Sequence, residues 1–137
     1  MADKKEQKVD FGEYAIVDPI EYQFKKAPEK WWRIKPVTSG MELDRAKYMM
    51  HNRVVETFDG VRHEQPPTAM EVAYREIALT FGGTNIMLDD GPILEEDAAP
   101  LEVENVLRTF PQEMVNEIWI EIGRNFPKWG PADPNSL

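Results

Sequence analysis

The chain has 137 residues, which is enough for one domain with a modest core. It contains no cysteine, so disulfides and thiolate metal sites are excluded, and it has no apolar run near the roughly 20 residues of a membrane-spanning helix. Its net charge is −9. The N-terminal sequence is charged and lacks the apolar centre of a secretory signal, so we expect a cytosolic protein without a membrane partner.

The negative charge is concentrated in one part of the chain. Residues 89–121 hold ten acids and a single base, whereas residues 1–88 are nearly balanced. A short basic segment at 25–35 carries five bases and one acid. An acidic surface disfavours nonspecific nucleic-acid binding, so no nucleic-acid partner is expected. The basic segment could instead bind the acidic end of another copy, which makes a homo-oligomer possible.

The first predicted element is a β-hairpin over residues 20–36. Residues 1–13 lack apolar periodicity and are predicted to form a disordered arm. Apolar and polar residues then alternate on both sides of a turn at 27–29, as in half-buried strands. The side chains predicted to face the core are Ile20, Tyr22, Phe24, Trp32 and Ile34. Trp31 falls on the opposite face, among basic residues.

Two helices are predicted next, at about 40–56 and 69–81. Ser39 with Glu42, and Thr68 with Glu71, have the spacing of capping boxes. The first helix is predicted to face the core with Leu43, Ala46 or Lys47, Met50 and Val54. The second is predicted to do so with Met70, Ala73 or Tyr74, Ile77 and Phe81, and to stop at Gly82-Gly83. Residues 84–99 are predicted to form a long acidic loop.

The last two helices are predicted at 100–108 and 111–124, with a tail at 132–137. Thr109 and Gln112 have capping-box spacing for the final helix. One face of that helix is apolar, with Val115, Ile118, Trp119, Ile122 and Phe126. The opposite face is acidic, with Glu113, Glu117 and Glu121. The predicted fold is mainly α: a single domain over 14–131 with four to five short helices and an N-terminal β-hairpin.

No residue pattern in the chain predicts catalysis, a cofactor or a metal. His51 and His63 have no third ligand nearby in sequence and are interpreted as surface residues. Asp89-Asp90-Gly91 and Glu95-Glu96-Asp97 lack the alternate-position spacing of an EF-hand, which favours a solvated acidic loop. We therefore expect a protein that is not an enzyme and has no cofactor.

Partner binding is the remaining function class, and two groups of residues are candidates for it. The first group lies outside the predicted core stripes, where aromatic and methionine side chains could form exposed contact area. It consists of Trp31, Met87 and Trp129. The second group lies at the margins of the final helix and consists of Glu113, Glu117, Glu121 and the exit at Phe126.

Four segments of the chain also suggest a family. They are WWRIKP at 31–36, REIALTFGGTNI at 75–86, PQEMVNEIW at 111–119 and PKWGP at 127–131. In this order and spacing they resemble the small tail assembly chaperones of long-tailed, siphovirus-type bacteriophages. The resemblance implies a small, largely helical protein of the host bacterial cytoplasm that is absent from the finished virion.

The resemblance further implies that the partners are the tape measure protein and the tail tube protein. Such chaperones hold the long, helical tape measure soluble and help recruit tube subunits around it. Apolar stripes with an acidic exterior suit that role. Two alternatives stay open from the residues: an acidic phage-encoded inhibitor or nucleic-acid mimic of a host defence complex, and a small structural protein of the head or tail.

Overall fold

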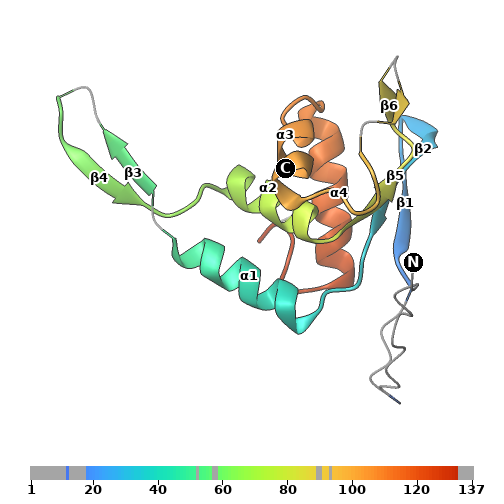
Figure 1. Ribbon diagram of the computed structural model, residues 1–137, viewed down its shortest axis with the longest axis horizontal. Coiled ribbons are helices and arrows are strands. Elements are labelled where there is room, and N and C mark those ends of the chain that lie inside the picture. The colour runs from blue at the N-terminus through green and yellow to red at the C-terminus, as the bar shows by residue number, and fades with distance from the viewer. Residues whose placement is uncertain are drawn as a thin grey trace, which may run out of the picture.

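The computed structural model describes residues 12, 18–51, 53–56, 59–88, 91–92 and 94–132. Within these residues the chain forms four helices, a three-stranded antiparallel sheet and two two-stranded sheets. Three of the helices gather beside the larger sheet, whereas the first helix and one hairpin extend away from it (Figure 1). The predicted N-terminal segment (residues 1–13) and C-terminal tail (132–137) lie almost entirely outside the described residues.

The larger sheet has the strand order β1-β2-β5 and forms one wall of the core. It contains β1 (Ile20–Phe24), β2 (Ala27–Ile34) and β5 (Phe81–Thr84). In the β1–β2 register, Ile20 lies opposite Ile34 and Tyr22 opposite Trp32. The predicted inner face is confirmed, because Phe24, Trp32 and Ile34 are buried while Ile20 and Tyr22 are partly buried against the core.

The third strand of this sheet, β5, is a correction to the prediction that the glycines at 82 and 83 only end a helix. Both glycines lie in the strand. A side chain at Gly82 would meet Arg33 at about 3.3 Å, and Gly83 has φ = +122° next to Trp31 and Glu96. Gly82 therefore allows β5 to approach β2 closely, and the positive φ favours glycine at position 83.

Helices α2, α3 and α4 supply the rest of the core. They span Ala69–Leu79, Pro100–Leu107 and Gln112–Asn125, each close to its predicted range. The predicted apolar face of α4 is confirmed, since its four central members are buried: Val115, Ile118, Trp119 and Ile122. Trp32 joins the sheet to the α3–α4 connection, because its ring centroid lies 4.8 Å from that of Phe81 in β5 and 5.7 Å from that of Phe110.

Helix α1 and the hairpin that follows it differ most from the prediction. The helix spans Ser39–Met50 and not 40–56, because residues Arg53–Glu56 form strand β3, which pairs with β4 (Arg62–Gln65). Two adjacent valines favour an extended chain, and Gly60 at φ = +82° supplies the return turn. We call α1, β3 and β4 the arm, and the β1-β2-β5 sheet with α2–α4 and residues 126–131 the body.

The orientation of α1 also corrects the prediction. Its predicted core stripe faces solvent, because Leu43 and Met50 are 55% and 82% exposed and Ala46 and Lys47 are exposed as well. The side toward the body carries Met41, Arg45 and Tyr48, all of them half-buried. Spacing alone identified an apolar stripe but could not determine which side of the helix would meet the body.

One predicted cap is confirmed and two are wrong. Thr68 caps α2 through its hydroxyl, which accepts from the Glu71 N–H and donates to the Glu71 carboxylate. Thr38, one residue before the predicted Ser39, caps α1. Thr109 does not cap α4; its hydroxyl donates to the Val106 carbonyl, and Pro111 is the residue before the helix.

The acidic segment 84–99 also contains strand structure that a simple loop would lack. Strands β6 (Met87–Leu88) and β7 (Gly91–Pro92) pair with each other. Asp89 and Asp90, predicted to be part of a solvated loop, lie outside the described residues. With its helices, its N-terminal hairpin and this further strand content, the fold is mixed α/β and not mainly α.

Candidate docking site

The arm helix α1 is attached to the body without burying any of its own residues. Its outer side carries Leu43 and Met50, and its flank carries Met49, which is 40% exposed. We call Leu43, Ala46 and Met50 the outer stripe. A helix of a globular domain normally turns its apolar stripe toward the core. Here the stripe is left open, and the helix is held by polar contacts together with Met41 and Tyr48, which pack partly buried against the core.

The main polar contact is made by a buried carboxylate on α2. Glu76 is 0% exposed, and its Oε2 accepts a hydrogen bond from Arg45 Nε at 2.6 Å. Its Oε1 accepts from the Trp119 indole N–H at 2.8 Å and from the Gly130 backbone N–H at 2.7 Å. A buried charge is tolerated when it is paired and fully hydrogen-bonded. Glu76 therefore joins α1, α4 and the C-terminal exit.

Sequence reasoning missed Glu76, although a signal was present. Glu76 lies at helical spacing within the buried face of α2, among Val72, Ala73 and Ile77. A single acid inside an apolar face indicates a buried partner. The partners come from positions 45, 119 and 130, and only the folded structure identifies them.

The C-terminal exit, residues 126–131, is a packed part of the body. Trp129 is 2% exposed, and its indole N–H donates to Glu42 Oε1 of α1 at 3.0 Å. Gly130 has φ = +83°, and a Cβ there would lie 2.5 Å from Gly123 Cα. The predicted exposed position of Trp129 is therefore wrong, because this side chain belongs to the core.

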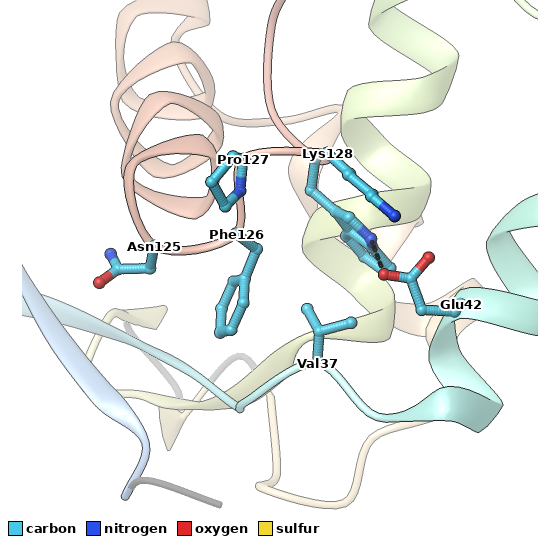
Figure 2. A pocket seen from close by; sticks show the side chains of 7 residues that line it. Val37, Glu42, Asn125, Phe126, Pro127 and Lys128 are labelled. Atoms are coloured by element: carbon cyan, nitrogen blue, oxygen red, sulfur yellow. Dashed lines mark hydrogen bonds between the residues drawn. The ribbon is translucent and has the colours of Figure 1, made fainter. Parts of the chain in front are cut away.

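A groove of about 420 Å³ lies between the exit and the start of α1 (Figure 2). Phe126 and Val37 form its apolar part, and Glu42 and Lys128 lie at its side. A second groove, of about 440 Å³, lies on the α2 side of the exit and includes Met49. Phe126 and Trp129 both line the first groove, but of the two only Phe126 is partly exposed.

The predicted acidic face of α4 is engaged with the chain's own hairpin. Glu113 pairs with Lys26 Nζ at 2.8 Å. Glu117 accepts from the Tyr22 hydroxyl at 2.7 Å and from the Lys25 backbone N–H at 3.0 Å. Burial, and then the hydrogen bond to Glu117, raise the pKa of Tyr22. The basic segment and the acidic helix, which could have joined two copies, therefore meet within one chain.

The remaining candidates lie elsewhere on the molecule. Glu121 forms an ion pair with Arg124 on its own helix. Trp31 is half-buried, and the Arg33 guanidinium lies 4.2 Å from the centre of its ring on the outer face of the sheet. Met87 is 58% exposed in β6. The structure places these residues on several surfaces and does not gather the predicted set into one site.

The described residues contain no group of three His, Asp or Glu side chains placed to hold a metal ion. His51 and His63 are both exposed, as predicted. No helix among the described residues is long and apolar enough to cross a bilayer.

Comparison with protein-family models, with curated proteins and with solved structures gives no match. The outer stripe of α1 and the two grooves along the C-terminal exit are apolar surfaces with a few charged groups at their margins.

Proposed function

We propose that the protein is a non-catalytic tail assembly chaperone of a long-tailed bacteriophage. In the host cytoplasm it would bind the tape measure protein and help to recruit tail tube subunits. The resemblance of four sequence segments to that family motivates the proposal. The observation that carries it is the outer stripe of α1, because a helix that exposes Leu43 and Met50 and buries no residue has apolar surface available to a partner.

The binding mode that this surface supports is helix-to-helix docking. An amphipathic client helix laid along α1 would cover Leu43 and Met50, and its next apolar side chain could enter the groove that Met49 lines. The helix that carries the stripe is only twelve residues long, so each contact is weak. Several copies bound along one long client would supply the avidity.

The client's solubility tests the proposal directly. The tape measure protein of the same phage is expressed alone, together with the wild type, or together with the double variant Leu43→Glu/Met50→Glu. We expect the wild type to keep the client soluble and the double variant to fail, because two carboxylates would have to be buried against the client helix. The proposal is overturned if the client precipitates to the same extent with and without the wild type.

A matched control separates the stripe from a general change of charge. The control is the double variant Asn105→Glu/Lys30→Gln. It lowers the net charge by two, as Leu43→Glu/Met50→Glu does, but at positions outside α1, one of them the exposed Asn105 of α3. We expect this control to protect the client like the wild type. Capture of a host nucleic-acid-binding complex in place of a tail protein would favour the acidic inhibitor, and recovery from purified particles would favour a structural virion protein.

A further inference from the structure

The β3–β4 hairpin of the arm is a sheet of only two strands. Within the described part of the chain no third strand joins it. All four residues of β4 are exposed, and the hairpin projects from the body at the end of the arm (Figure 1). An isolated two-stranded sheet is marginally stable in water, and its outer edge is a template for another strand.

We propose that two copies of the chain associate by antiparallel pairing of β4 with β4 of the second copy, giving a four-stranded sheet. A two-fold axis perpendicular to such a sheet must pass between two identical residues. With His63 opposite His63 of the second copy, Arg62 lies opposite Glu64 of the second copy, and Glu64 opposite its Arg62. Both symmetry-related pairs are therefore of opposite charge, which stabilises neighbouring strands.

The alternative centre of symmetry is less favourable. If Glu64 lay on the axis, two carboxylates would face each other and Arg62 would have no acid opposite it. Like charges directly opposite on adjacent strands are destabilising. Arg62 on the axis would likewise place two guanidinium groups opposite each other, so among Arg62, His63 and Glu64 the order favours His63 as the centre of self-pairing.

The charge of the arm also favours a second copy at this place. Residues 39–65 hold five acids and four bases, whereas the rest of the chain holds twenty acids and twelve bases. Two bodies that are both strongly acidic repel each other. The nearly neutral arm, with its hairpin at the far end, is where two chains can meet with the least repulsion.

Self-pairing would have a consequence for α1. The helix ends at Met50 and β3 begins at Arg53, so each copy would bring its outer stripe to the shared sheet. A dimer would thus present two stripes to one client, which raises the effective affinity. The pairing itself goes beyond the proposed function, because it requires no client and is tested without one.

The test is sedimentation of the purified full chain from about 1 μM to about 1 mM, since one short strand pair gives a weak interface. The wild type is expected to shift from monomer to dimer. Glu64→Arg places arginine opposite arginine in both pairs and is expected to weaken the dimer roughly tenfold. Glu95→Arg makes the same charge change at an exposed site outside the arm, in the segment before α3, and is expected to leave the dimer intact or slightly stronger.

A mixing experiment makes the register falsifiable. Arg62→Glu alone also places Glu opposite Glu and is expected to be monomeric, but an equimolar mixture with Glu64→Arg restores opposite charges in both pairs. We expect the mixture to form a one-to-one heterodimer. A wild type that stays monomeric throughout, or a dimer that Glu64→Arg leaves unchanged, overturns the proposal. A mixture that stays monomeric overturns the register centred on His63.

Discussion

The body and the arm of this molecule are held together by different kinds of interaction. Among the residues with described side chains, the buried ones lie in the body or in the segments that connect its elements, and none lies in α1 or β4. The body is stabilised by apolar burial around Trp32 and α4. The arm is attached by the polar contacts of Arg45 and Glu42 and by Met41 and Tyr48, which pack partly buried against the core. Because most of the buried apolar surface lies in the body, substitutions on the outer surface of the arm are expected to affect folding less than substitutions in the body.

The largest expected effect tests this division with two truncations. Trp32→Ala empties the centre of the body and is expected to lower the free energy of unfolding by about 3–5 kcal/mol. Leu43→Ala on the outer stripe is expected to change it by less than about 0.5 kcal/mol, because the side chain is already in water. Urea denaturation of both variants measures the difference. A loss above about 1 kcal/mol for Leu43→Ala would mean that the stripe is part of the core.

The contact between arm and body that is centred on Glu76 is expected to give the next largest effect on stability. Glu76→Gln removes the charge that faces Arg45 and leaves one acceptor oxygen for the Trp119 and Gly130 donors. We expect the free energy of unfolding to fall by about 2–3 kcal/mol, since the partners of a buried charge are left unsatisfied. Amide hydrogen exchange should show α1 losing protection before α2 does.

The control for Glu76→Gln is Glu102→Gln, which changes an exposed acid on α3. It is expected to change stability by less than about 0.5 kcal/mol. If Glu76→Gln lowered amide protection equally in α1 and α2, the two helices would unfold as one cooperative unit. The arm would then not be a separate unit from the body.

The body could be predicted from the sequence far better than the arm. The stripe Val115–Ile118–Trp119–Ile122 and the alternation in β1 and β2 each follow from one local period, so both were assigned to the correct face. Strand β5 was missed because Gly82-Gly83 has the local pattern of a helix stop. Its partner, β2, lies some fifty residues earlier in the chain, and the need for glycine is set by that contact.

The arm was misread for a related reason. Leu43, Ala46 and Met50 have the spacing of a core stripe, and Val54 continues it, so the pattern predicted one long inward-facing helix. The orientation of α1 is decided by Arg45 reaching Glu76 and by Glu42 accepting from Trp129. Polar contacts across 31 and 87 residues of sequence leave no local period. The exposure of the candidate docking surface therefore had to come from the structure.

The smallest expected effect concerns an acid inside the body and depends on pH. Glu104 of α3 lies 3.4 Å from Arg75 Nη2 at the seam with α2. Burial raises the pKa of Glu104 above its ordinary value of 4.5, and Arg75 and Arg108 only partly offset this. Between the unfolded and folded pKa values the folded state binds more protons, so this group's contribution to stability falls as pH rises through that window.

Glu104→Gln removes this titration, so its effect should change with pH. The unfolding free energy of the variant, measured against the wild type, is expected to rise from pH 4.5 upward and to level off once Glu104 is ionised in the folded protein. Urea titrations at a series of pH values measure it. If attraction to Arg75 outweighed burial, the folded pKa of Glu104 would lie below 4.5, and the difference would instead fall as pH rises toward 4.5 and stay level above it. That result would make the α2–α3 seam an electrostatic contact like the one that holds the arm, and the contrast between the two regions would lose its basis there.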